Sequence, residues 1–199
     1  MPAIGITGGI STGKTTFCDC LRELLPAAKI FNADQSARDL VQHDSEVRSE
    51  IFRHFGPGVY SASGDLNRSA LRAIVFADAA QKRVLEQILH PRIRRLWSAE
   101  AKTYRSSSEF FFADIPLLYE THGETLCDAV VVVACSPDIQ RERLRKRSHL
   151  SADEADEMIA SQMSLSEKVK RADHVVWNND GRAVLLEQAR LIVERWRTS

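Results

Sequence analysis

The sequence predicts an α/β fold in which helices cover both faces of a five-stranded parallel sheet. Five short apolar runs of strand length alternate along the 199-residue chain with segments whose apolar residues recur at helical spacing. Two of the runs, EFFFADIPLL at 109–118 and DAVVVVACS at 128–136, are apolar almost throughout. Such runs are typical of parallel strands that are buried on both faces.

The first 34 residues predict a strand, a turn, a helix and a second strand. PAIGIT, at 2–7, is a short apolar run that leads into glycines. Apolar residues then recur at helical spacing from Phe17 to Leu25, and Pro26 ends that helix. KIFNAD, at 29–34, predicts the second strand, which ends on polar residues.

A long helical insertion is expected between the second and third strands. It runs from residue 35 to about residue 105 and is interrupted by a loop at 55–67. Arg68 and Arg72 lie one helical turn apart just after this loop, so both can grip one anionic group. His90, which precedes a proline, is either a ligand-binding residue or a residue that fills a helix junction.

Two later helices carry clear start signals. Ser136 is expected to cap a helix that has Pro137 in its first position. Ser151 and Glu154 have the spacing of a capping box, in which each side chain binds the other residue's backbone amide. The chain then continues with a fifth strand at 173–180 and a closing amphipathic helix at 182–196.

Composition argues against several classes of protein. Lys plus Arg and Asp plus Glu number 27 each, so no overall positive field attracts nucleic acid or an anionic membrane. No apolar run reaches the length of a membrane span, and the N-terminus lacks the features of a signal peptide. A cytoplasmic protein is expected, either a monomer or a weak homo-oligomer. The four cysteines form no CxxC pair, and we expect buried or partly buried thiols.

GITGGISTGKTT, at 5–16, contains a phosphate-binding motif. Gly8-x4-Gly13-Lys14-Thr15 has P-loop spacing and lies between a predicted strand and a predicted helix, as that motif requires. The glycines let backbone N–H groups point at phosphate oxygens, and the next helix directs its positive end at the same place. Lys14 supplies a charge for the β- and γ-phosphates, and the Thr15 hydroxyl can hold Mg²⁺. The stretch predicts a triphosphate site.

Other segments bear on the fate of the γ-phosphate. A GTPase would carry an Asn-Lys-x-Asp segment after a late strand, and WNND at 177–180 lacks the lysine. A small kinase needs an acceptor site, a carboxylate near the acceptor hydroxyl and a basic lid over the phosphates. Asp34 can orient or deprotonate a hydroxyl, bind Mg²⁺ through water, or simply cap the next helix. Asp114 has a Walker-B-like position, and RERLRKR at 141–147 is either a lid or a solvated helix face.

Several segments taken together are much more specific than the P-loop, which many families share. They include Leu89-His90-Pro91, Pro116-Leu117-Leu118 and the pattern Gln140-x2-Arg143-x3-Arg147. The other segments are NADQSARDLV, DLNRSALRAIVF, SPDIQRERLRKR and SQMSLSEKVKRADHVVWNN. In this combination the chain resembles the dephospho-CoA kinase family along nearly its whole length.

The resemblance implies a P-loop kinase core with a helical substrate-binding insertion and a helical lid. The implied activity is phosphorylation of the ribose 3′-hydroxyl of dephospho-CoA by ATP with Mg²⁺, the last step of coenzyme A synthesis. On this basis residues 1–33, 107–136 and 171–199 are expected to form the nucleotide-binding core. Residues 34–106 are expected to bind the acceptor, and residues 137–170 to form the lid.

The same resemblance assigns roles to individual residues. The expected catalytic residues are Asp34 as the base, Lys14 and Arg143, and the expected Mg²⁺ ligand is Thr15. ATP is expected to contact Gly9, Ser11, Thr12, Gly13, Lys14, Thr15, Thr16, Arg143 and Arg147. Dephospho-CoA is expected to contact Asp34, Arg68, His90, Pro116, Leu117 and Leu118.

Two positions depart from the pattern of the family. Ser11 stands where the family usually has glycine, so the loop must take its shape with a β-carbon present. Asn32 stands where the family usually has aspartate, which leaves Asp34 as the better candidate for the base. Two alternatives remain open. One is a nucleoside monophosphate kinase, which shares the core and the lid, and the other is a nucleotide-switched binding protein without catalysis.

Overall fold

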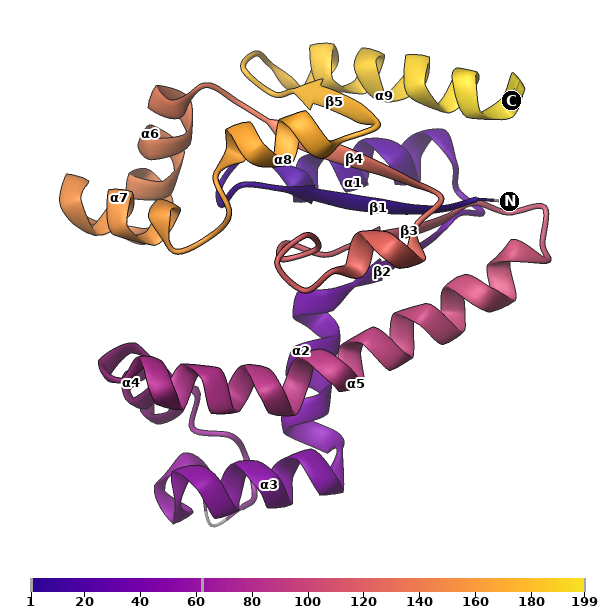
Figure 1. Ribbon diagram of the computed structural model, residues 1–199. Helices are drawn as coiled ribbons and strands as arrows, with labels where there is room; N and C mark the ends of the chain where they lie inside the picture. The colour runs from indigo at the N-terminus through magenta and orange to yellow at the C-terminus, as the bar shows by residue number, and fades with distance from the viewer. Residues whose placement is uncertain (1, 62, 199) are drawn as a thin grey trace. The chain divides into compact units, whose positions relative to one another are not determined.

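A five-stranded sheet forms the centre of one of the two compact units in the computed structural model, which describes residues 2–61 and 63–198 (Figure 1). The strands are β1 (Ala3–Gly8), β2 (Lys29–Asn32), β3 (Phe111–Asp114), β4 (Ala129–Ala134) and β5 (His174–Trp177). Their order is β2-β3-β1-β4-β5, and β1 pairs in parallel with both β3 and β4, as β4 does with β5. The predicted α/β fold with a five-stranded parallel sheet is confirmed.

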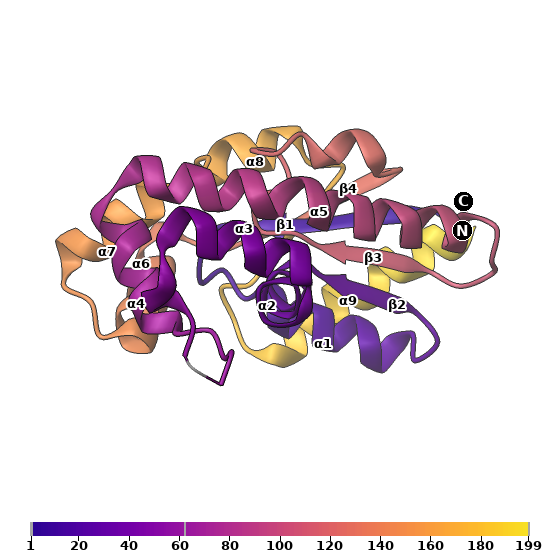
Figure 2. The same ribbon diagram turned by 90° about the horizontal axis from the view of Figure 1, so that it is seen from below.

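Helices cover both faces of this sheet. α1 (Lys14–Leu24) and α9 (Arg182–Thr198) pack against each other on one face, and α8 (Leu165–Arg171) lies on the other (Figure 2). A large apolar cluster is buried around α1, α9 and the sheet, and its members include Ile4, Phe17, Phe112, Val131 and Leu185. The loop that follows β1 therefore starts from a rigid part of the molecule, because β1 is the central strand.

Residues 32–99 form a second compact unit, which is helical. It contains α2 (Ala33–His43), α3 (Ser45–Phe55), the short 3-10 helix η1 (Pro57–Val59), α4 (Arg68–Ala77) and most of α5 (Ala79–Arg105). The unit has an apolar core of its own, which includes Val41, Val47, Ile51, Val59, Leu71 and Ile88. The helical character expected for this region is confirmed, as is its interruption before α4.

The remaining helices begin where the capping signals predicted. In α6 (Pro137–Ser148), the Ser136 side chain accepts a hydrogen bond from the Ile139 amide, and Pro137 occupies the first turn. α7 (Ala152–Ala160) begins with a complete capping box between Ser151 and Glu154. A short 3-10 helix, η2 (Gly123–Leu126), lies between β3 and β4.

The third strand ends earlier than predicted. β3 stops at Asp114, whereas the apolar run continues to residue 118. Pro116 has no N–H to donate to a neighbouring strand, and its carbonyl oxygen accepts a hydrogen bond from the Thr7 hydroxyl at 3.0 Å. The chain therefore leaves the sheet after Asp114, and the residues that follow turn across the end of β1.

The second strand also ends earlier than predicted, at Asn32 and not at Asp34. The Asn32 side chain accepts a hydrogen bond from the Gln35 amide at 2.7 Å, so Asn32 ends β2 and caps α2. Asp34 lies in the first turn of α2 and is exposed. The alternative interpretation of Asp34 as the helix cap is wrong, because Asn32 takes that place.

The cysteines behave as expected. Cys18, Cys20 and Cys135 are buried, Cys127 is partly buried, and all four thiols are free. Burial, followed by the charge of Asp128, raises the pKa of Cys127 to about 12. Within the described part of the chain, no helix is both long and apolar enough to cross a membrane.

The contact between β5 and α9 predicts a loss of stability in mild acid. Nε2 of His174 accepts a hydrogen bond from Nε1 of Trp196 at 3.2 Å, which requires an unprotonated Nε2. Burial, and then the charge of Arg195, lower the pKa of His174 below its usual 6.5. The folded state thus binds the proton more weakly than the unfolded state. This contribution to stability is present above pH 6.5 and is lost as the pH falls through the lowered value.

Urea unfolding at about pH 7.5 and about pH 5.5 tests this expectation. The free energy of unfolding should fall more in the wild type than in His174→Gln, whose amide does not titrate. Equal losses in the two proteins would show that other groups cause the acid sensitivity.

Candidate functional site

The loop between β1 and α1 has a backbone that most residues do not adopt. Gly13 has a φ of 95° and Ser11 a φ of 58°, both in the left-handed region. A β-carbon on Gly13 would collide with the side-chain amide of Asn178, and one on Gly9 would lie 2.5 Å from Nε2 of Gln140. Glycine is therefore needed at both positions, since side chains from other elements press directly on the loop.

Hydrogen bonds engage the carbonyl oxygens of this β1–α1 loop. Nε2 of Gln140 donates to the carbonyl of Ile10 at 2.9 Å, and Nδ2 of Asn178 donates to the carbonyl of Thr12 at 2.8 Å. The Thr12 hydroxyl donates to the carbonyl of Gly9 at 2.9 Å. A free carbonyl oxygen would repel a phosphate group. Because these three carbonyl oxygens accept hydrogen bonds from side chains, the loop can bind an anion more favourably.

The N-terminus of α1 adds positive potential beside the loop. Gly13 is its N-cap and provides no side chain, and the first turn contains no acidic residue. The first N–H groups of a helix have no acceptor within it, and the helix dipole is positive at that end. Nζ of Lys14 lies 3.4 Å from the carbonyl oxygen of Gly9, so the ammonium group folds back over the loop. Thr15 is exposed and Thr16 half-buried, which leaves the Thr15 side chain accessible.

A small pocket adjoins the loop. Its volume is about 250 Å³, and its lining residues are Gly13, Thr16, Arg143, Asn178, Asp180 and Arg182. Nη1 of Arg143 donates to the carbonyl of Asn178 at 2.8 Å. Arg143 is thus brought to the loop from α6, and its contact with the nucleotide stays a prediction. Arg147 lies one turn further along α6, is exposed, and is not among these lining residues.

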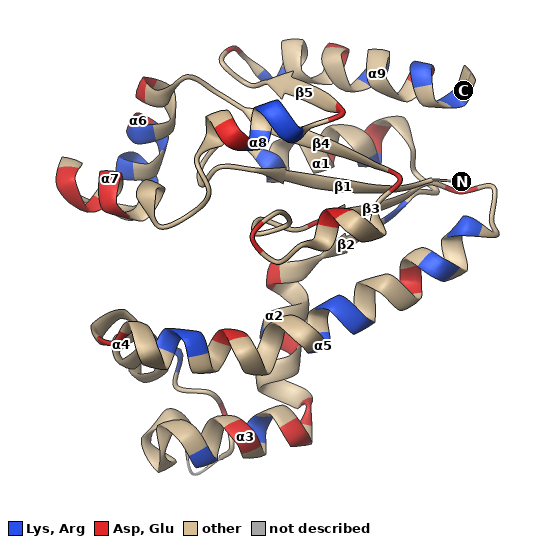
Figure 3. Ribbon diagram, in the orientation of Figure 1, with Lys and Arg blue, Asp and Glu red and all other residues tan. Residues whose placement is uncertain are grey.

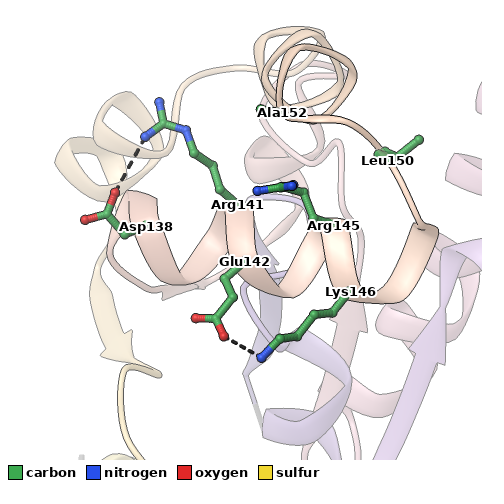
Figure 4. Close-up of a pocket in the computed structure, with 7 residues that line it drawn as sticks. All are labelled: Asp138, Arg141, Glu142, Arg145, Lys146, Leu150 and Ala152. Atoms are coloured by element: carbon green, nitrogen blue, oxygen red, sulfur yellow. Dashed lines mark hydrogen bonds and ion pairs between the residues drawn. The ribbon is translucent and has the colours of Figure 1, made fainter.

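α6 and α7 carry opposite charges. Basic side chains dominate the end of α6 and acidic ones the start of α7 (Figure 3). Nε of Arg141 binds Asp156 at 2.6 Å, which joins the two helices, and Lys146 pairs with Glu142 along α6. Arg145 and Ala152 line an open pocket between the helices (Figure 4). Arg143 thus faces the loop whereas Lys146 pairs on the surface, and the role of the 141–147 segment as a lid stays a prediction.

The residues after β3 lie against the end of β1. Asp114 is paired in register with Ile6 and is only 5% exposed. The carbonyl of Pro116 accepts hydrogen bonds from the Thr7 hydroxyl at 3.0 Å and from Nζ of Lys168 at 2.8 Å. Leu117 and Leu118 follow, half-buried and buried respectively. The expected acceptor segment 116–118 is thereby fixed to the strand that leads into the β1–α1 loop.

The other predicted acceptor residues belong to the second compact unit. Asp34 and Arg68 are exposed in the first turns of α2 and α4. Arg72 lies over the ring of Phe76, 5.1 Å from its centre, so Arg68 and Arg72 have different surroundings. His90 is half-buried in α5, and burial lowers its pKa despite the opposing charge of Glu86. A neutral imidazole in this position suits hydrogen bonding better than anion binding.

Three side chains that organise the site received no role from the sequence. Gln140 and Asn178 bind loop carbonyls, and Lys168 binds the carbonyls of Gly8 and Pro116. Gln140 lay within a recognised pattern but without an assigned contact. The sequence contained one indication for Lys168. It lies three residues after Leu165, so the two side chains are expected on the same face of a short helix. Asn178 had none, since its contact depends on how β5 ends.

Ser11 is strained, and removing its side chain is expected to stabilise the protein. Its φ of 58° is unfavourable for a residue with a β-carbon, and its buried Oγ has no hydrogen-bond partner among the described residues. Ser11→Gly should raise the free energy of unfolding by about 1 kcal/mol, after the entropy cost of glycine in the unfolded chain.

Urea unfolding checks this result, with Ser11→Ala as the control. Alanine removes the buried hydroxyl and keeps the β-carbon, so it separates the two sources of strain. A Ser11→Gly protein that is no more stable than wild type would show that the loop accommodates the β-carbon without cost.

Comparison with known proteins gives one consistent family. The family model described as dephospho-CoA kinase matches residues 2–183. A dephospho-CoA kinase from Listeria monocytogenes is 36% identical over 194 residues, which are 97% of this chain and 96% of the relative. A dephospho-CoA kinase from Anaeromyxobacter dehalogenans is 45% identical over 179 residues, which are 89% of this chain and 84% of the relative.

A solved structure agrees with the sequence comparisons. The dephospho-CoA kinase from Campylobacter jejuni superposes with a TM-score of 0.74 at 25% identity, covering 96% of this chain and 95% of that chain. The similarity extends over both compact units, since it leaves out only a few residues of the chain.

Proposed function

Because the chain belongs to the dephospho-CoA kinase family, we propose that it transfers the γ-phosphoryl group of ATP to the ribose 3′-hydroxyl of dephospho-CoA. The products are ADP and coenzyme A. The observation that carries this proposal is the β1–α1 loop, which combines left-handed glycine geometry, engaged carbonyls and the start of α1 at Lys14. We expect the reaction to take place in the cytoplasm, and we expect neither nucleic acid nor a membrane as a partner.

The nucleotide half of the reaction is assigned to the loop and to α6. Backbone N–H groups from Gly9 to Thr16 bind the phosphates, and the Lys14 ammonium neutralises the charge that spreads over the transferred group. Arg143 is already held beside the loop by the carbonyl of Asn178, so it needs little movement to reach a phosphate. Arg147 is exposed and reaches the nucleotide only if α6 and α7 close over it as a lid. α8, the last part of the proposed lid at 137–170, is fixed to the sheet by Lys168.

The residues present fit Mg²⁺ with ATP. Mg²⁺ usually takes one or two oxygen ligands from the protein and the rest from phosphates and water. The Thr15 hydroxyl is such a ligand, because it is exposed in the first turn of α1, next to Lys14. When bound, the ion would neutralise the β- and γ-phosphate charge.

The acceptor half is assigned to residues 34–106 and to the segment 116–118. Asp34 takes the proton of the 3′-hydroxyl, a role for which an exposed carboxylate that accepts no helix-capping bond is available. Arg68 provides a positive charge for an acceptor phosphate, and His90 a neutral hydrogen-bonding group. Pro116 and Leu117, which are half-buried, are assigned to the acceptor, and the buried Leu118 holds this segment against the sheet.

A product assay with an acceptor panel tests this function. Purified protein with MgATP is incubated with dephospho-CoA, AMP, CMP, UMP or dTMP, and both ADP release and product mass are measured. We expect strong stimulation with dephospho-CoA alone, together with a product of the mass of coenzyme A. Stimulation by a nucleoside monophosphate instead would replace the proposed acceptor. ATP binding without any stimulated turnover would favour a nucleotide-switched binding protein.

A further inference from the structure

Lys168 is a fully buried lysine in the middle of α8. Its side chain is 0% exposed, and its ammonium group has three oxygen partners. Nζ lies 2.9 Å from Oε1 of Glu120, 2.8 Å from the carbonyl oxygen of Pro116 and 3.4 Å from that of Gly8. Since an ammonium group has three N–H donors, the three partners match its capacity.

The partners of Lys168 come from two segments with separate proposed roles. Gly8 is the last residue of β1 and leads directly into the phosphate-binding loop. Pro116 and Glu120 belong to the segment after β3, part of which is assigned to the acceptor. Glu120 also accepts a hydrogen bond from the Met163 amide at 3.0 Å, just before α8. One buried ion pair thus connects the nucleotide segment, the acceptor segment and the helix that carries the lysine.

Stability alone does not account for a charge at this place. Burying an ion pair has a desolvation cost that its Coulomb attraction often fails to exceed, and well-packed apolar residues are frequently as stable. Burial lowers the pKa of Lys168, while the hydrogen bond that Lys168 donates to Glu120 opposes that shift. What an apolar side chain cannot do is hold two carbonyl oxygens at fixed distances from one atom. The ammonium group does this for Gly8 and Pro116.

We propose that Lys168 is a positioning residue of the kinase reaction. It sets the spacing between the start of the phosphate-binding loop and the segment 116–118, and Glu120 orients its ammonium group. This role rests on the proposed function, in which those two segments serve the donor and the acceptor. Lys168 touches neither substrate, and its effect on phosphoryl transfer passes through the backbone atoms that it binds.

Four variants separate positioning from stability. Lys168→Met keeps much of the side-chain volume but leaves the half-buried carboxylate of Glu120 without its ammonium partner, so the melting temperature should fall by several degrees. Lys168→Met combined with Glu120→Gln removes that unpaired charge and should recover most of the loss. Lys170→Met, alone and with Glu167→Gln, removes an exposed ion pair from the same helix and serves as the matched control.

The decisive measurements are kcat and the KM values of the two substrates. In the double variant at positions 168 and 120 we expect kcat to remain at least about tenfold below wild type, with KM for ATP changed less than about threefold. The two control variants should match the wild type. A double variant that recovers both melting temperature and kcat would reduce Lys168 to a structural residue and overturn the proposal.

Hydrogen exchange provides a test that does not depend on the substrate. The amides of Leu117 and Leu118 should exchange faster in the double variant than in the wild type, and unchanged exchange would also overturn the proposal. The wild-type protein could fail to phosphorylate dephospho-CoA while exchange at these amides still responds to the variants. That result would contradict the proposed function but support the link that Lys168 makes between Gly8 and the segment 116–118.

Discussion

Lys14→Ala is expected to reduce kcat by about a hundred- to a thousandfold while the fold stays intact. The ammonium group lies 3.4 Å from the carbonyl oxygen of Gly9, above a loop in which Gln140 and Asn178 bind the carbonyls of Ile10 and Thr12. It is therefore the one side-chain cation that the β1–α1 loop itself supplies for the β- and γ-phosphates. The side chain is only half-buried, so its removal should change the free energy of unfolding by less than about 1 kcal/mol.

Steady-state kinetics and thermal unfolding of Lys14→Ala check this expectation. Lys102→Ala, which alters an exposed lysine in the last turn of α5, is the control for the loss of one positive charge. Wild-type turnover in Lys14→Ala would remove the loop from the reaction. A large loss of stability in that variant would mean that the lysine supports the loop and not the phosphates.

The elements that the sequence predicts well are those set by local chemistry. The capping box at Ser151, the serine and proline at the start of α6, and the P-loop spacing all depend on residues within a few positions of each other. The continuous apolar run at 128–136 predicts a buried strand because burial on both faces leaves no room for polar residues. The residue pattern also predicted the helical insertion, whereas its role as the acceptor-binding region came only from the family resemblance and stays a prediction.

The errors arise at the ends of two strands, where the sequence allows more than one boundary. Pro116 ends the usable part of β3, and the carbonyl of Pro116 turns toward Thr7, more than one hundred positions earlier in the chain. Asn32 caps α2, and a sequence that has Asn32 and Asp34 two positions apart gives no rule for choosing between them. In both cases the sequence allows the strand to end at more than one residue, and the structure shows which residue ends it.

Separation along the chain explains why three site residues were missed. Gln140, Lys168 and Asn178 bind backbone atoms that lie between 52 and 166 positions away along the chain. Polar side chains of this kind look like ordinary surface residues until the fold brings the carbonyls to them. The sequence indicates two of these contacts only indirectly, through Gly9 and Gly13. The absence of a side chain at these positions makes room for the amides of Gln140 and Asn178.

Asp34→Asn is expected to lower kcat by about a hundredfold or more, with little change in ATP affinity. The substitution keeps the shape of the side chain and removes its ability to accept a proton. Asn32 caps α2, so Asp34 contributes to the helix only through its charge in the first turn, worth about 0.5 kcal/mol. The loss of turnover should therefore far exceed any loss of stability.

Titration of ATP binding beside steady-state kinetics distinguishes the possible roles of this carboxylate. Asp39→Asn, on the same helix, is the matched control, because Asp39 accepts a hydrogen bond from Gln35 and has no proposed contact with substrate. If Asp34→Asn weakens binding of MgATP as much as it lowers kcat, Asp34 is a metal ligand. If the variant retains full kcat, proton transfer from the 3′-hydroxyl needs no protein base, and positioning with charge neutralisation accounts for the reaction.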